Sequence, residues 1–190
     1  MLTKKRVTIL FTLLIILLFS AWLIITSHSI KTTGNKPQTP DAFMTEITAV
    51  QFNKLGKLNN TLTSPKLVHY QQEDTTLLDT PYIIHYVEDE PPWHISAKHG
   101  KAVDETTKII LWEKVKFHQP PGPNSHNTTL LTSKMTYYPK KSFAETDAPV
   151  TIIQPGTIVH SIGLQADLNK VEITLLSQVR GQYDKALASS

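Results

Sequence analysis

From residue 42 onward the chain consists of short runs of β-branched and aromatic residues separated by turn residues, with no long stretch of helical periodicity. Runs of this composition, broken by polar residues, glycine and proline, are typical of antiparallel sheet. The sequence therefore predicts an all-β domain. We expect strands within residues 47–52, 67–70, 82–87, 93–97, 108–112, 115–118, 130–138, 150–153, 157–164 and 171–176.

A weak repeat runs through the same region. Each repeat unit has a polar turn, a short strand, a break and another strand, and the units cover residues 75–86, 106–119, 140–154 and 169–183. Val115, Val150 and Val179 occupy similar places in three of the units, at intervals of 35 and 29 residues. Such periods indicate stacked supersecondary units with open terminal edges, as in solenoids and open jelly rolls.

The first 26 residues have the pattern of a membrane anchor. Lys4, Lys5 and Arg6 precede an uncharged apolar run from Val7 to Thr26, which as a helix would be about 30 Å long, the hydrocarbon thickness of a bilayer. A cleavable signal peptide is the alternative, but its apolar core is usually only about 7–15 residues long. The longer run favours an uncleaved helix, with the N-terminus in the cytoplasm and the rest of the chain outside it.

These features divide the chain into five parts. We expect a cytoplasmic tip at residues 1–6, a transmembrane helix at 7–26, a polar linker at 27–41, a β domain at 42–184 and a disordered tail at 185–190. The basic residues of the tip account for the excess of 19 Lys and Arg over 16 Asp and Glu, so the exported part is electrically balanced. Balanced charge argues against nucleic acid as a partner, because phosphate contacts need a basic surface.

The residue types also exclude several kinds of chemistry. The chain has no cysteine, which excludes disulfides, thiolate nucleophiles and Cys-ligated zinc, and favours a bacterial cell envelope over a small secreted animal domain. It has no G-x-S-x-G, P-loop or G-x-G-x-x-G motif. His94 is expected on the outer face of a strand and His99 in a turn, and their spacing supplies no further zinc ligands. We therefore expect no enzymatic activity, no cofactor and no metal, and residues 88–90 indicate a solvated hairpin tip.

Three stretches carry a family resemblance. "NKLGKLNNTL" has the form of a hairpin with Gly56 at its turn. "TPYIIHY" followed by "WHISAKHGKAVDETTKIILWEKVKF" gives a strand, a W-x-I-x-A strand, a turn and a pair of strands, and "HSIGLQAD" places Ser161, Gly163 and Leu164 in an S-x-G-L segment. In this order behind an uncleaved anchor, the stretches resemble the LptC family, the single-pass inner-membrane component of lipopolysaccharide export in Gram-negative bacteria. The resemblance extends to about Tyr183.

This resemblance implies a twisted, open β-jellyroll of the OstA-like type in the periplasm, held at the cell inner membrane by the helix. Its apolar interior would hold the acyl chains of lipopolysaccharide. The helix and the N-terminal edge would meet an inner-membrane ABC transporter that extracts the lipid, and the C-terminal edge a periplasmic bridge protein of the same fold. The chain departs from the family pattern in the proline-rich break at residues 118–127 and in Pro65, which within a strand fits only an edge or a bulge.

The apolar residues of the expected strands are candidates for one continuous inner face that binds lipid. These residues are Trp93, Ile95, Ala97, Leu111, Val115, Phe117, Leu131, Met135, Tyr137, Ile162 and Leu164. An ordinary dry core would use the same residues, so the residues alone leave both interpretations open, and the resemblance favours a groove. The alternative function is a membrane-tethered structural or adaptor β domain that binds only protein.

The last expected strand has the features of a docking edge. Its candidate residues are Val171, Ile173, Leu175, Val179, Gly181 and Tyr183. An unused edge is normally protected by prolines or several charges, yet Arg180 is the only charged residue between Ile173 and Tyr183. We therefore expect this edge to pair with a strand of the bridge protein by β-augmentation, the alternative being that the tail folds back over it.

Overall fold

The structure, a computed structural model, describes residues 40–104 and 106–184, and its regular elements in this part are strands and two short 3-10 helices. The strands are β1 (Ala42–Phe52), β2 (Leu58–Tyr70), β3 (Thr75–Asp79), β4 (Tyr82–Val87), β5 (Glu90–Ser96), β6 (His99–Val103), β7 (Lys108–Gln119), β8 (Thr128–Tyr138), β9 (Phe143–Gln154), β10 (Thr157–Asp167) and β11 (Glu172–Tyr183), and the short helices are η1 (Gln71–Glu73) and η2 (Pro139–Lys141).

The predicted all-β domain is confirmed in this part of the chain. The expected transmembrane helix, nearly all of the expected linker and the expected tail lie outside the described residues. Within residues 40–104 and 106–184, no helix is long and apolar enough to cross a membrane.

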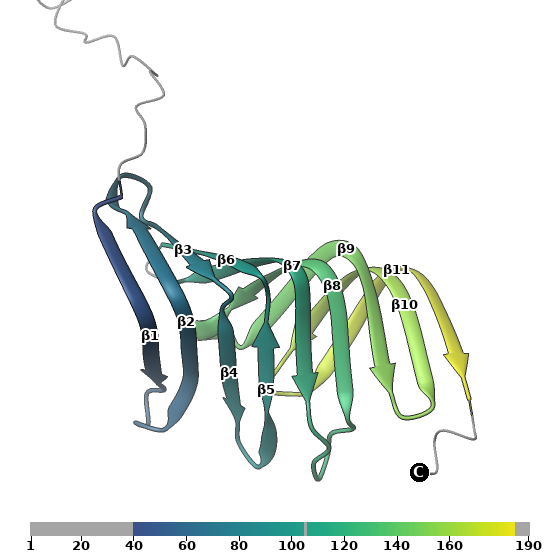
Figure 1. Cartoon of the computed structure of the whole chain (residues 1–190). Helices are drawn as coiled ribbons and strands as arrows, with labels where there is room; N and C mark the ends of the chain where they lie inside the picture. Colours follow the sequence, from purple (N-terminus) through teal and green to yellow (C-terminus); the bar gives the residue numbers. More distant parts are fainter. Residues whose placement is uncertain (1–39, 105, 185–190) are drawn as a thin grey trace, which may run out of the picture. The chain divides into compact units, whose positions relative to one another are not determined.

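The strands form one antiparallel sheet that folds over on itself, and the long strands β7 to β11 arch from one layer into the other (Figure 1). We call the layer that contains β4 and β5 the front layer and the layer that contains β3 and β6 the back layer. β4 and β3 continue one another along β2, pairing with its residues 60–63 and 66–70. β5 and β6 continue one another along β7 in the same way. β2 and β7 therefore each cross from one layer to the other at a bend near the middle of the strand.

The bends coincide with interruptions of the strand register. In β7 the register shifts between Trp112 and Val115, in β8 between Thr132 and Thr136, and in β10 between Ile162 and Leu164. The backbone at the shifts in β7 and β10 has positive φ, 59° at Glu113 and 79° at Gly163. Extra residues in one strand of a pair bend that strand and sharpen its twist, so the row of bulges forms the corner between the layers.

Serine and threonine side chains satisfy carbonyl groups that the bends release. Five hydroxyls donate to such carbonyls over 2.7–3.2 Å, namely those of Ser64, Thr132, Thr146, Ser161 and Ser177. Thr146 bridges two backbone groups, because its hydroxyl also accepts a bond of 3.1 Å from the Ala148 N–H. An unsatisfied buried polar group costs about 1–3 kcal/mol, so these bonds lower the free-energy cost of bending the sheet.

The strands are longer than the sequence predicts because they run through the bends. The expected strands at 108–112 and 115–118 are both parts of β7. Pro65 in β2 lies at a break in the ladders on both sides of the strand, between the parts that pair with β4 and β3 and opposite Glu46 of β1, whose φ is 52°. The β1–β2 register is the same before and after this break, so the proline lies at neither an edge nor a bulge that shifts the register. Val115 and Val150 both lie opposite Thr132, from the two strands that flank β8, which explains one interval of the weak repeat.

Two residues expected on the inner face lie on the outer one. Leu131 is 38% exposed and Ile162 is 36% exposed. Strict alternation along β8 would place Leu131 on the same face as Met135. The register shift between Thr132 and Thr136 changes this alternation, so Leu130 is buried and Leu131 is not. The bulge at Gly163 has the same effect on β10, where Leu164 is buried and Ile162 faces outward.

Replacing Thr146 by valine should lower the free energy of unfolding by about 1–3 kcal/mol, because the Lys134 carbonyl and the Ala148 N–H both lose their partner. Valine keeps the branched shape and suits a strand, so the change isolates the hydroxyl. The measurement is the urea midpoint at unchanged slope. Thr174→Val, at an exposed position of β11, is the control and should stay within about 0.5 kcal/mol of the parent. Equal midpoints for the two variants would contradict the role given to the hydroxyl.

Candidate functional site

Apolar side chains fill the space between the two layers. Nine of the predicted lining residues meet there, each at most 5% exposed: Trp93, Ile95, Ala97, Leu111, Val115, Phe117, Met135, Tyr137 and Leu164. The rings of Phe117 in the front layer and Tyr137 in the back layer meet edge to face, with their centroids 6.4 Å apart. Burial of a large apolar side chain contributes about 1.5–3 kcal/mol, so this interior is the main attraction between the layers.

Sequence reasoning missed other members of the interior. Ile83, Ile109, Leu130 and Leu168 are each at most 3% exposed. The alternation within β4 and β7 could have indicated Ile83 and Ile109. No strand pattern could have found Leu168, because it lies in the turn between β10 and β11.

A network of polar side chains lies at the end of the interior next to β1. Asn60 Oδ1 accepts a bond of 2.6 Å from the Tyr137 hydroxyl and lies 2.9 Å from His85 Nδ1, and Asn60 Nδ2 donates to Gln51 Oε1 over 2.8 Å. On its other side, His85 Nε2 lies 3.2 Å from Asn169 Oδ1. The network joins β1, β2 and β4 to β8 and to the β10–β11 turn. Buried polar groups linked in this way fix one packing of the layers.

Burial sets the protonation of the two titratable members of the network. It lowers the pKa of His85, although the contact with Asn169 opposes this shift, and it raises the pKa of Tyr137. Both side chains are therefore neutral at neutral pH, and the Tyr137 hydroxyl acts as a hydrogen-bond donor.

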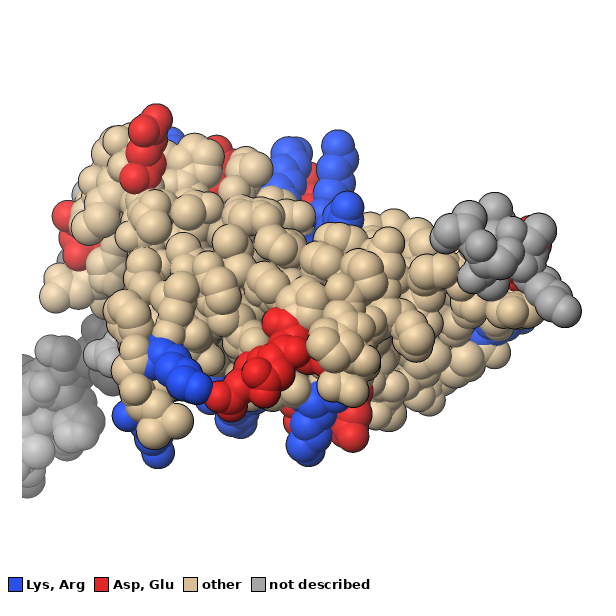
Figure 2. Space-filling model, turned by 90° about the horizontal axis from the view of Figure 1, so that it is seen from below, with Lys and Arg blue, Asp and Glu red and all other residues tan. Residues whose placement is uncertain are grey.

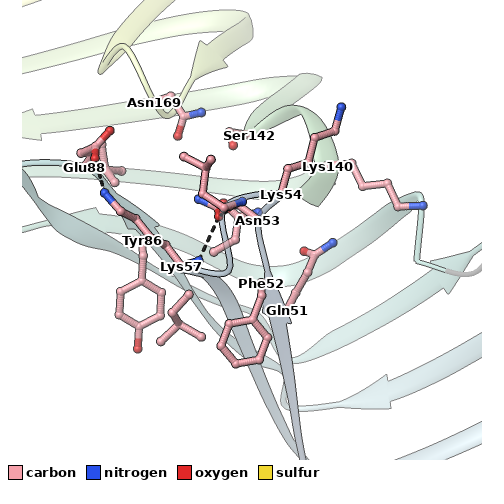
Figure 3. Close-up of a pocket in the computed structure, with 14 residues that line it drawn as sticks. Gln51, Phe52, Asn53, Lys54, Lys57, Tyr86, Glu88, Lys140, Ser142 and Asn169 are labelled. Atoms are coloured by element: carbon pink, nitrogen blue, oxygen red, sulfur yellow. Dashed lines mark hydrogen bonds and ion pairs between the residues drawn. The ribbon is translucent and has the colours of Figure 1, made fainter.

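The side of the two layers opposite the bends lies at the bottom in Figure 1, and we call it the lower rim. A cleft of about 780 Å³ opens there, where the two layers part. We call it the rim cleft. Its front wall comes from the β1–β2 hairpin and β4, and its back wall from Lys140, Ser142 and Asn169 (Figure 3). Phe52 and Leu55 in the hairpin are 62% and 81% exposed. The complete lining consists of Gln51, Phe52, Asn53, Lys54, Leu55, Lys57, Leu58, Asn59, Tyr86, Val87, Glu88, Lys140, Ser142 and Asn169.

A smaller space of about 260 Å³, which we call the inner cavity, lies beside the polar network and opens to solvent on one side. Its walls are mainly apolar and include Val50, Leu62, Ile83 and Ile109. Gln51 lines both the inner cavity and the rim cleft. The end of the interior next to β1 thus combines the mainly apolar inner cavity, the polar network and the rim cleft with its lysine side chains.

The histidines and acids singled out in the sequence have ordinary contacts. His94 Nδ1 lies 2.6 Å from the Tyr82 hydroxyl. His99 begins β6 instead of lying in a turn, and its ring nitrogens are 3.9 and 4.0 Å from carboxylate oxygens of Asp79 and Glu113. Glu88 forms an ion pair of 2.6 Å with Lys57. In the part of the chain that the structure describes, no three His, Asp or Glu side chains are grouped so as to hold a metal ion.

The proline-rich break at residues 118–127 folds back onto the start of β5. Glu90 accepts bonds from the Asn124 N–H over 2.7 Å and from the Ser125 hydroxyl over 2.8 Å. Gln119 Nε2 donates to the carbonyl of Pro91 over 3.1 Å. The break is therefore a docked loop of the front layer.

Both ends of the folded sheet are edges within the described chain. β1 pairs there with β2 alone and β11 with β10 alone. Of the predicted edge residues, Ile173 and Leu175 pack against the core, whereas Val179 and Tyr183 are 53% and 67% exposed and Gly181 is exposed as well. Val171 lies in the turn before the strand and also packs against the core. The predicted edge therefore has a core-facing half and an exposed half.

Comparison with known proteins agrees with this architecture. Residues 10–184 match the sequence model of the family described as lipopolysaccharide-assembly, LptC-related. The fold is similar to that of LptH, described as the LptA homologous periplasmic component of the conserved lipopolysaccharide transport device from Pseudomonas aeruginosa, with a TM-score of 0.52 at 6% identity over 66% of this chain and 94% of that chain. A search of curated proteins finds no match. The similarity to LptH shows an LptA-like β-jellyroll fold.

His85 should make the stability depend on pH. Its pKa is below the ordinary 6.5 in the folded state, so the unfolded chain takes up the proton first. The free energy of unfolding should be greatest above about pH 6.5, the ordinary pKa of histidine, and should fall as the pH is lowered below it. His85→Gln keeps a hydrogen-bonding side chain that does not titrate, and should lose less stability over the same window in urea unfolding.

The control is His118→Gln. Desolvation and the nearby Lys116 also lower the pKa of His118, but this side chain is only partly buried, so its removal should flatten the pH dependence less. An unchanged slope in His85→Gln would contradict the prediction.

Proposed function

This chain belongs to the LptC-related family of lipopolysaccharide-assembly proteins, and from that membership we propose that it is a non-enzymatic carrier of lipopolysaccharide. It receives the lipid from an inner-membrane ABC transporter, holds the acyl chains in the apolar interior and passes them to a periplasmic bridge protein of the same fold. A single helix at residues 7–26, with the N-terminus in the cytoplasm, anchors it in the inner membrane, and the β domain lies in the periplasm.

The observation that carries this proposal is the continuous apolar interior between two open edges. Buried apolar side chains extend from Ile83 in β4 to Leu164 in β10 without a charged residue among them. The edge strands at the two ends expose apolar side chains, such as Val50 on β1 and Val179 on β11. The sequence has no nucleotide-binding motif, so the energy for lipid movement comes from the partner.

The alternative, an adaptor that binds only protein, is less well supported. Membership of a lipopolysaccharide-assembly family supports a lipid ligand, and the exposed apolar residues of the rim cleft lie beside ammonium groups, which suits an anionic amphiphile.

A photoreactive residue at Met135 should capture lipopolysaccharide, because this side chain is fully buried between the layers. The same residue at Leu131, four positions earlier in β8 and 38% exposed on the outer face, should capture little. The measurement is the yield of covalent adduct from the full chain after irradiation with purified lipopolysaccharide. Equal yields at the two positions would show that the interior is a closed core and not the lipid site.

A proline at Val179 should abolish association with the bridge protein, because it removes a backbone donor from β11 and disturbs the edge that would pair. Val50→Pro is the matched control on β1, since the two valines are similarly exposed on opposite edges. It should weaken association with the ABC transporter instead. The measurement is co-purification of each partner with the full chain. Undiminished recovery of the bridge protein with Val179→Pro would contradict docking at β11.

A further inference from the structure

The turn between β10 and β11 closes the lower rim of the interior. Leu168 in this turn is fully buried, and its carbonyl accepts a bond of 3.3 Å from Trp93 Nε1 in the front layer. The next residue, Asn169, is exposed but reaches His85 Nε2, also in the front layer, over 3.2 Å. We call Leu168 and Asn169 the latch. It connects the back layer to the front layer through Trp93 and His85.

The interior has little room for a lipid while the latch is closed. Trp93, Ile95 and Phe117 have no exposed surface, and the inner cavity of about 260 Å³ lies at the β1 end. Protein interiors pack as densely as organic crystals, so an acyl chain cannot lie among these side chains unless the layers separate. Separation at the lower rim requires the Trp93 and His85 bonds to break.

The turn that carries the latch is strained. Val171 has a φ of 56°, in the left-handed region that β-branched residues rarely occupy. A backbone in such a region costs about 1–3 kcal/mol and persists only where its surroundings hold it. The turn is held locally by the Lys170 N–H, which donates to Asp167 Oδ1 over 3.1 Å, and by the bond from the Leu168 N–H to the Ser142 carbonyl over 2.8 Å. Both of these bonds lie within the back layer, so they can persist when the bonds to Trp93 and His85 break.

The latch also forms part of the rim cleft. Asn169 lies in its back wall, across from the β1–β2 hairpin (Figure 3). Among the described residues Lys57 is paired with Glu88, whereas Lys54 and Lys140 form no ion pair. Exposed apolar residues beside such ammonium groups fit a lipid whose headgroup is negatively charged.

The rest of the lower rim is compatible with a lipid. Seen from below, most of the surface of this part of the chain carries no charged side chain, and the charged side chains are gathered in a few places (Figure 2). Transfer of acyl chains past this rim therefore requires little desolvation of charged groups.

We propose that a lipid with an anionic headgroup enters the interior from the side, through the rim cleft, and that the latch must release before its acyl chains can reach Trp93. This inference rests on the proposed function and adds a lateral entrance to the passage between the two edges. The headgroup remains at Lys54 and Lys140 while the acyl chains move between the layers.

A cleavable cross-link can hold the latch closed. The chain has no cysteine, so Glu88→Cys and Lys170→Cys introduce one thiol in each layer, at side chains that are 74% and 67% exposed. The thiols are joined in the full chain by the shortest effective linker that a reductant cleaves. A photoreactive residue is placed at Leu55 in the rim cleft or at Met135 in the interior. The readout is the yield of adduct with purified lipopolysaccharide.

The linked protein should still give the Leu55 adduct, whereas the Met135 adduct should fall about tenfold, as for an opening equilibrium shifted by about 1.4 kcal/mol. Cleavage of the linker should restore the Met135 adduct. A control link between Glu88→Cys and Asn124→Cys, both in the front layer, makes the same change in the rim cleft without joining the layers, and should leave the ratio of the Met135 adduct to the Leu55 adduct unchanged.

The outcomes separate the latch from the proposed function. An undiminished Met135 adduct in the linked protein would overturn the latch while leaving lipid binding intact. Capture at Met135 without capture at Leu55 would overturn the rim cleft as the entrance. If neither position captures lipopolysaccharide in the unlinked protein, the proposed function itself is wrong and the lateral entrance is excluded with it.

Discussion

The hydrogen bonds from serine and threonine hydroxyls to carbonyls at the bends are the interactions on which the rest of this structure depends. An antiparallel sheet with one apolar face must cover that face with another layer. Here the sheet covers itself, because the long strands such as β2 and β7 bend near their middle. A bulge releases backbone groups from the ladder, and Ser64, Thr146 and Ser161 satisfy such groups at buried positions. Without these bonds the corner would carry a row of unpaired carbonyls.

The two layers are connected more strongly at the corner than at the lower rim. At the corner the two layers are continuous backbone, with ladders running through it on either side of each bulge. At the lower rim the described contacts between layers are made by side chains, chiefly through Asn60, His85 and Trp93. A typical hydrogen bond contributes only about 1 kcal/mol net, so the hydrogen bonds at the rim resist separation much less than the continuous backbone of the corner does.

The folded sheet has an open edge at each of its two ends. A closed barrel would have no edge, whereas this sheet presents β1 at one end and β11 at the other. An exposed edge can extend onto a strand of another protein, and the apolar interior then continues into the partner. Under the proposed function, such continuity passes a lipid along without exposing its acyl chains to water. The same arrangement explains why Val50 and Val179 remain exposed while the strands between them are buried on one face.

The sequence by itself determined the all-β class, the family and most of the interior, since alternation along a strand is a local property that needs no knowledge of the fold. Trp93, Ile95 and Phe117 were found in this way. Tertiary structure decided the direction of Leu131 and Ile162, because the bulges that bend β8 and β10 shift the alternation by one residue. It also decided the roles of His85 and Leu168. Their partners Asn169 and Trp93 are distant in the chain and meet them only when the sheet folds over, which a local pattern cannot express.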